Sequence, residues 1–325
     1  MDLAEDLLRL SRERDDAAGL VQGHFAIGRT LMFIGKFGPA RSHLEKSLSL
    51  HNEFGPPAIS RGVGTIQMRV ELQMYGVQMY SAIVLACLGY PDQALSNSAA
   101  SAVEARGLAD PISLATSMAM RSRLLSLVGD DMALGEQADH LVSLTIEQGF
   151  RQWHAQGTIY RGWVQAKNGD VAEGMPLLRS GIITFRASGT EVWLPHFLAL
   201  RASACDLAGE AEEGLSRLDE AMQIVDKTGK RWLEAELYRL RGQLLLRREH
   251  AEAAEELYRK ALSIAQEQEA KLWELRASAS LARLRRDHGR RTEARDLLAP
   301  VYGWFTEGFD TPDLKDAKAL LDELT

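Results

Sequence analysis

Four arginines recur at one spacing along the middle of the chain and have the clearest potential for binding chemistry. Each lies forty residues from the next: Arg121, Arg161, Arg201 and Arg241. A guanidinium presents a fork of N–H donors that fits carboxylates and phosphates. If the spacing reflects a structural repeat, stacking sets these side chains in a row. The row then predicts a binding surface for an acidic peptide or another anion, with Trp163 facing the same groove.

A row of like charges also has a structural interpretation, because neighbouring helices can supply the counter-charges. Acidic residues such as Glu173 and Glu213 are candidates for that pairing. The two interpretations make different demands on a variant with two of the arginines reversed in charge. If the row binds a partner, this variant no longer captures the partner but its helices melt as before. If the row is structural, the variant does not fold.

No other residue pattern predicts catalysis, a metal site or a cofactor. The sequence contains no G-x-x-x-x-G-K-[ST] phosphate loop, no H-E-x-x-H, no paired C-x-x-C and no G-x-S-x-G. Its eight histidines are scattered, and none has another histidine four residues away. Six arginines gather within 283–295, but no aromatic residues interleave with them. We therefore expect a non-enzymatic chain without a cofactor, and no binding of nucleic acid.

Composition predicts a globular protein of the cytoplasm. The 325 residues have a formal net charge of −7, and 46% of them are hydrophobic. No apolar run reaches the ~18 residues that a membrane span needs, and the N-terminus has no signal-peptide core. Cys87 and Cys205 lie in helical patterns and are expected to be reduced core thiols. We expect no contact with a membrane.

The forty-residue spacing of the arginines extends to the glycines expected in the turns between helices. One series falls at Gly129, Gly169, Gly209 and Gly289, with Glu249 in the missing place. A second series, offset by twenty residues, falls at Gly149, Gly189 and Gly229. Glycine just past a helix adopts the left-handed cap without steric cost. Two offset series therefore predict a repeat of two helices.

Two more series keep the same register. Small residues occupy one position of successive first helices, where they allow a partner helix to come close: Ser122, Gly162, Ala202, Gly242 and Ala282. Tryptophans open the first helices: Trp153, Trp193, Trp232 and Trp273. They are expected to form the core seam between repeats, with an aromatic ligand platform as the alternative. The glycine, small-residue and tryptophan series together predict an all-α chain.

Within one unit the pattern resembles the tetratricopeptide repeat. Gly28, Gly35, Phe37 and Ala40 match the family's skeleton of two glycines, an aromatic residue and an alanine. Leu88–Ala94 and His288–Ala294 repeat its turn. The turn positions predict about seven two-helix repeats, and the resemblance implies that these form a right-handed superhelix, an α-solenoid. The period of forty exceeds the family's usual 34, which predicts longer helices and a wider solenoid.

The whole chain, 1–325, is expected to form one solenoid domain with three special segments. Residues 2–14 form either a half-repeat, in which case the chain is a piece of a longer protein, or a simple cap helix. The Pro/Gly-rich region 52–75 is predicted as an insertion or loop. Residues 311–325 are predicted as a capping helix, because Thr311-Pro312 is a favourable helix start.

The C-terminal part resembles a more particular group of proteins. Ala235–Gly242, Leu281–Leu284 and above all Leu297–Leu314 are similar to the C-terminal repeats of bacterial signalling proteins. In that family a class III adenylate/guanylate cyclase domain, often with a STAND-type or AAA-type ATPase domain, precedes the repeats. The resemblance implies a non-catalytic regulatory or sensor module that binds a protein, a peptide or its own upstream domains. A free-standing adaptor and a small-molecule sensor of the transcription-activator type are the alternatives.

Overall fold

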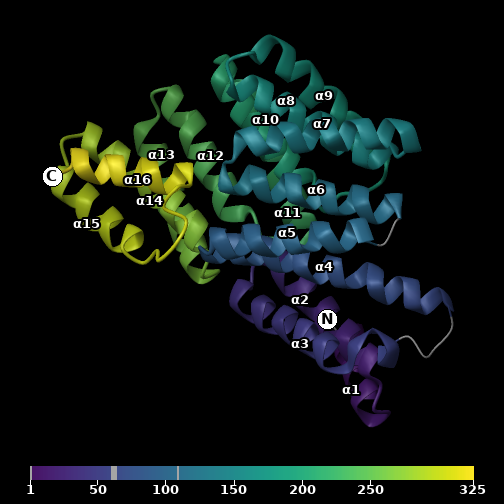
Figure 1. Cartoon of the computed structure of the whole chain (residues 1–325). Helices are drawn as coiled ribbons and strands as arrows, with labels where there is room; N and C mark the ends of the chain where they lie inside the picture. The colour runs from purple at the N-terminus through teal and green to yellow at the C-terminus, as the bar shows by residue number, and fades with distance from the viewer. Residues whose placement is uncertain (1, 60–63, 108–109) are drawn as a thin grey trace.

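The computed structural model describes residues 2–59, 64–107 and 110–325, and these form sixteen helices and no strand (Figure 1). In chain order they are α1 (Asp2–Glu13), α2 (Ala17–Phe33), α3 (Phe37–Ile59), α4 (Gly64–Leu88), α5 (Pro91–Gly107), α6 (Pro111–Val128), α7 (Asp131–Gln148), α8 (Arg151–Lys167), α9 (Val171–Ala187), α10 (Leu194–Ala208), α11 (Ala211–Thr228), α12 (Glu234–Arg247), α13 (Ala251–Glu267), α14 (Lys271–Asp287), α15 (Arg291–Tyr302) and α16 (Pro312–Glu323). The prediction of an all-α fold is confirmed.

Consecutive helices from α2 to α15 pack as hairpins, and each hairpin stacks on the next. The glycines of the forty-residue series end their helices in the left-handed conformation, with φ of 78° at Gly129 and 99° at Gly169. Glu249 takes the same role with φ of 64°. The turn positions, and with them the two-helix unit, are therefore as the sequence predicts.

Glu249 should carry backbone strain, because its Cβ is crowded when φ is positive. We expect Glu249→Gly to raise the free energy of unfolding by about 0.5–1 kcal/mol. Glu256→Gly, on the exposed face of α13, is the matched control and should lower it by about 1 kcal/mol. Urea unfolding of the two variants measures both changes. A loss of stability in Glu249→Gly would contradict the left-handed backbone conformation of Glu249.

The small-residue series lies where two helices of a hairpin cross most closely. A Cβ added to Gly162 would lie 2.7 Å from the carbonyl oxygen of Gly174, and one added to Gly174 would lie 2.5 Å from the carbonyl oxygen of Gly162. The backbones of α8 and α9 therefore touch directly at this point. The expected close approach of the partner helix is found here.

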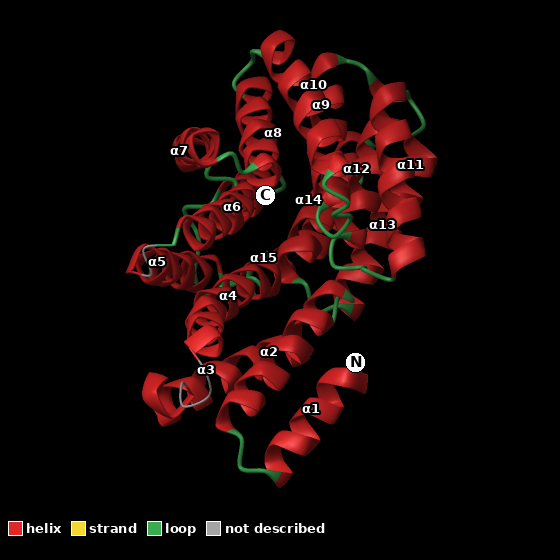
Figure 2. Ribbon diagram, turned by 90° about the vertical axis from the view of Figure 1, so that its right-hand side faces the viewer, coloured by secondary structure: helices red, strands yellow, loops and turns green. Residues whose placement is uncertain are grey.

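The stack turns back on itself, so that repeats far apart in sequence meet. Figure 2 shows α5 and α7 on one side of the molecule and α11 and α13 on the other. The backbone N–H of Trp232 donates to the carbonyl oxygen of Phe33 over 3.1 Å. In the same region Trp193 packs on Trp232 and Phe33, with ring centroids 5.4 and 5.1 Å apart. Trp193, Trp232 and Trp273 are thus buried core residues, and Trp153 is half-buried.

The three special segments have distinct structures. Helix α1 packs on α2 through Leu8 but leaves the side chain of Leu3 88% exposed. Of the predicted insertion 52–75, residues 60–63 lie outside the described residues; α3 continues to Ile59 and α4 begins at Gly64. Helix α16 covers α14 and α15. No helix in the described ranges is both long and apolar enough to cross a membrane.

Candidate functional site

A cavity of about 390 Å³ lies on the inner face of the superhelix. The first helices of successive hairpins, α6, α8, α10, α12 and α14, form its walls, and the start of α16 completes them. Stacking presents the same face of each first helix to the inside, so residues forty apart become neighbours. The site is therefore built from a wide span of the sequence.

One repeat position supplies an inner polar column, defined as Gln156, His196, Glu236 and Arg276. These four residues are forty apart, and the first three are less than 9% exposed. The last three line the cavity. The sequence-based prediction did not include this column. The signal that could have found it is a polar residue recurring in the otherwise apolar middle of each first helix.

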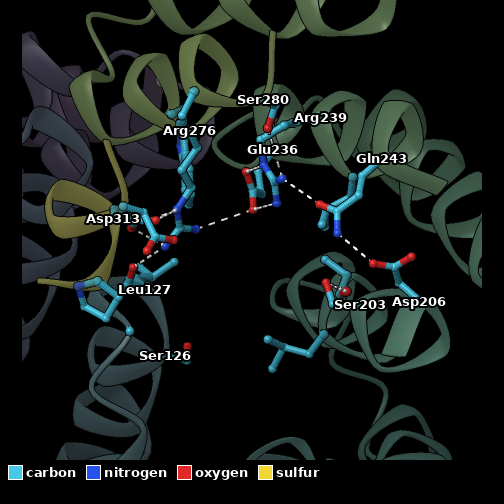
Figure 3. Close-up of a pocket in the computed structure, with 18 of the residues that line it drawn as sticks. Ser126, Leu127, Ser203, Asp206, Glu236, Arg239, Gln243, Arg276, Ser280 and Asp313 are labelled. Carbon is cyan, nitrogen blue, oxygen red and sulfur yellow. Dashed lines mark hydrogen bonds and ion pairs between the residues drawn. The ribbon is translucent and has the colours of Figure 1, made fainter. Parts of the chain in front are cut away.

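Arg276 is the most connected residue of the column (Figure 3). Its Nε lies 3.1 and 3.0 Å from the two carboxylate oxygens of Asp313, and its Nη2 donates to Asp313 Oδ2 over 2.8 Å. The same Nη2 donates to the carbonyl oxygen of Leu127 over 2.7 Å. Burial opposes the charge of Arg276, but Asp313 and Glu236 outweigh it and raise its pKa. A guanidinium held this way is a fixed cation.

Glu236 and Arg239 form the adjoining pair of the wall. Arg239 Nε and Nη2 donate to the two carboxylate oxygens of Glu236 over 2.7 and 2.8 Å. Burial disfavours the charged carboxylate, yet Arg239 and Arg276 together hold the pKa of Glu236 below its usual value. Arg239 Nη1 also donates to Gln243 Oε1 over 2.9 Å, and Gln243 Nε2 donates to Asp206 over 2.7 Å. The wall is charged but close to neutral in sum.

His196 belongs to the buried side of the cavity. Its Nε2 lies 3.2 Å from Ser126 Oγ, and its ring packs near Tyr160 and Trp232, with centroids 6.2 and 6.0 Å away. Burial, reinforced by the cations Arg123 and Arg276, lowers the pKa of His196 to about 3. The imidazole is therefore neutral near pH 7.

The predicted arginine row lies outside the cavity lining, and two of its members, Arg161 and Arg241, pair across neighbouring hairpins. Arg161 donates to Asp139 on α7 over 2.7 Å, and Arg241 pairs with Asp219 on α11. Arg201 pairs instead with Glu213. The reason is that position 179, where the repeat would place an acid, is an arginine.

Other predicted residues occupy different surroundings. Arg121 and Glu173 form no ion pair within the ranges 2–59, 64–107 and 110–325. Glu213, proposed from the sequence as a counter-charge, does pair with the row. Trp163 lines the cavity, with the Lys167 ammonium 5.8 Å from its ring centroid. Partner binding by the row stays a prediction.

Two ion pairs of the row, those of Arg161 and Arg241, are exposed enough to contribute little stability. The side chains of Arg161 and Asp139 are 38% and 61% exposed, and water screens such pairs. We expect Arg161→Gln and Arg241→Gln each to change the free energy of unfolding by less than about 1 kcal/mol. Urea unfolding tests this, and a loss above about 2 kcal/mol in either variant contradicts it.

Comparison with known proteins supports a tetratricopeptide repeat region. The family described as tetratricopeptide repeat matches residues 235–268, which fall in α12 and α13. An uncharacterized protein of Rhizobium meliloti (strain 1021) is 32% identical over 132 residues, which are 40% of this chain and 13% of that protein. The chain thus matches only a small part of its relative's length.

Solved structures share the fold at low sequence identity. NprR in complex with its cognate peptide NprX is 14% identical, with a TM-score of 0.58 over 94% of this chain and 82% of NprR. A Rap protein complexed with competence and sporulation factor is 10% identical, with a TM-score of 0.56 over 94% and 96% of the two chains. Aspartyl phosphate phosphatase F from Bacillus subtilis is also 10% identical, with a TM-score of 0.56 over 94% of this chain and 75% of its own. The fold is a tetratricopeptide-like α-solenoid.

Proposed function

We propose that this chain is a non-catalytic regulatory module that binds a peptide or protein segment in the cavity lined by the inner polar column. The observation that carries the proposal is the construction of this cavity from α6, α8, α10, α12, α14 and α16. A ligand there touches the first helices of five hairpins and the start of α16. Its binding therefore favours one curvature of the superhelix over others.

The chemistry of the cavity suits a peptide. Ligand pockets of ~300–1,000 Å³ combine apolar walls with a few fixed polar groups. Here Trp163, Leu200 and Leu233 supply apolar surface. Arg276 and Glu236 supply fixed charges of both signs, which can bind carboxylates and amides. Two proteins of similar fold, NprR and the Rap protein, are seen with a peptide or factor bound.

We further propose that the module works inside a larger cytoplasmic signalling protein with a nucleotide cyclase or ATPase domain. The support is the resemblance of Leu297–Leu314 to such proteins and the greater length of the Rhizobium relative. Cys87 and Cys205 are buried free thiols, as in proteins of a reducing compartment. A free-standing adaptor shares the same cavity. The volume of the cavity favours a small-molecule sensor, because it is near the lower end of the range for ligand pockets.

A peptide selection tests the proposed function. We expect a phage-displayed library of random heptapeptides to yield sequences that bind the purified chain. Ser203→Phe, which fills the cavity, should weaken the selected peptides at least tenfold in fluorescence anisotropy. Ser216→Phe on the exposed face of α11 is the matched control and should bind as the unaltered chain does.

Three results contradict the proposal. Equal binding by Ser203→Phe and Ser216→Phe places the peptide site elsewhere. If no peptide is enriched and a metabolite screen shifts the melting temperature, the chain is a small-molecule sensor. Turnover of a nucleotide by the purified chain would overturn its assignment as non-catalytic.

A further inference from the structure

The acid that fills the fork of Arg276 comes from the C-terminal helix of the same chain. Asp313 is the second residue of α16, and it makes three contacts of 2.8–3.1 Å with this guanidinium. Asp316, one turn later, lies 3.8 Å from Arg283 of α14. Both acids and both arginines line the cavity. The first turn of α16 thus presents an acidic face to a basic face of α14.

The segment before α16 is attached to the start of α5, in the second hairpin of the superhelix. Glu307 Oε1 accepts the backbone N–H groups of Asp92 and Gln93, over 2.9 and 3.1 Å. In return Gly308 N–H donates to Asp92 Oδ2 over 3.0 Å. Glu307 therefore caps the N-terminus of α5, where Tyr90 precedes the helix and offers no capping oxygen. We define residues 303–316 as the latch.

The polar contacts of the latch can be exchanged with water more readily than its apolar contacts, because Phe305 and Leu314 of the latch are buried in a hydrophobic core cluster. The hydrogen bonds of Glu307 lie among exposed groups, where water competes. Trp304 contacts Tyr90 at 5.5 Å between ring centroids but is itself only half-buried. On the other side the superhelix is held together by the ring contact of Trp193 with Phe33 and by the backbone hydrogen bond from Trp232 to Phe33. Release of the latch therefore leaves that junction in place.

Removal of Asp313 changes the charge of the cavity. Arg276 would keep Glu236 at 3.4 Å, but Glu236 already neutralises Arg239 at 2.7 Å. One guanidinium is then left without its own carboxylate in a buried wall, which is unfavourable until another anion arrives. A bidentate carboxylate fits this position best.

We propose that Asp313 and Asp316 stand in for two acidic side chains of the ligand, and that an acidic peptide binds by displacing them and releasing the latch. This inference rests on the proposed function and names its ligand class. The tethered acids compete at a high effective concentration, so the closed chain excludes weak acidic peptides. Binding and latch release are then linked in both directions.

The test uses the chain's own latch as the probe. An acetylated peptide of residues 308–318 is titrated against the unaltered chain and against the double variant Asp313→Asn/Asp316→Asn. We expect the double variant to bind this peptide at least tenfold more tightly. A peptide with both aspartates changed to asparagine should show no such gain, and adding Arg276→Met should abolish it. Asp310→Asn is the matched control, because Asp310 belongs to the latch but pairs with Lys315.

Hydrogen exchange gives a second readout that needs no ligand. In the double variant the amides of 303–323 should exchange faster, while those of α8 and α9 stay as protected as before. Unchanged exchange at 303–323 together with equal affinities for the acidic and the amide peptide overturns the latch. Heptapeptides that bind the cavity with no preference for acidic residues would overturn the latch and leave the proposed function standing. Gain of latch-peptide binding in the double variant supports the latch even if the heptapeptide library yields nothing.

Discussion

Replacing Gly174 with alanine is expected to lower the free energy of unfolding by about 3 kcal/mol. The new Cβ would lie 2.5 Å from the carbonyl oxygen of Gly162 and 2.7 Å from the backbone nitrogen of Ala166. These are backbone atoms of the facing helix, so rotation of a side chain cannot relieve the contact. Helices α8 and α9 must separate, and overpacking of this kind costs ~1–3 kcal/mol or more.

The matched control is Gly135→Ala in α7. A Cβ at Gly135 would meet Val164 at 3.5 Å, an ordinary contact. Alanine is favoured over glycine inside a helix by about 1 kcal/mol, so this variant should be slightly more stable. Urea unfolding, followed by circular dichroism, measures both. Similar stabilities for the two variants would show that α8 and α9 do not cross as closely as described.

Acidification from pH 7 to pH 4.5 is expected to cost the chain ~2.5 kcal/mol through His196 alone. The folded pKa of about 3 lies below the unfolded value of ~6.5, so the unfolded chain binds the proton more readily. The stability is therefore fully present above pH ~6.5, is lost as pH falls, and stops falling only near pH 3. Around the imidazole, Arg123 and Arg276 oppose protonation, and Ser126 and the nearby rings offer no negative charge.

His196→Gln separates this contribution from the rest of the acid sensitivity. Glutamine can keep a hydrogen bond to Ser126 and does not titrate, so the variant should lose ~2.5 kcal/mol less stability over the same pH range. His24, whose pKa is lowered to about 4 by burial and by His43, adds a loss of the same sign in both chains. His140→Gln on the exposed face of α7 is the control. If the free energy of unfolding of His196→Gln and of the unaltered chain changes with pH in parallel, His196 is not the source of this acid sensitivity.

The amino-acid pattern is enough to specify the helices and the unit that repeats. Left-handed glycines at a spacing of forty end the helices, and small residues at the same spacing mark the helix crossing at Gly162. Both are local properties, because caps and hairpin contacts involve residues close together in sequence. For this reason periodicity alone predicts them correctly. The period also gives the helix face of Trp163, but its place in the cavity lining comes from the tertiary structure.

The choice of which arginines face the cavity, and the way the superhelix closes, depend on the tertiary structure. Arg161 and Arg241 recur as regularly as Glu236 and Arg276, yet the first pair lies between hairpins and the second lines the cavity. Periodicity shows that residues share a face but not which face turns inward, since that depends on the small rotation accumulated at every repeat. The same accumulated rotation brings Asp313 and Arg276 to the carbonyl of Leu127, and no local signal records a contact at that distance along the chain.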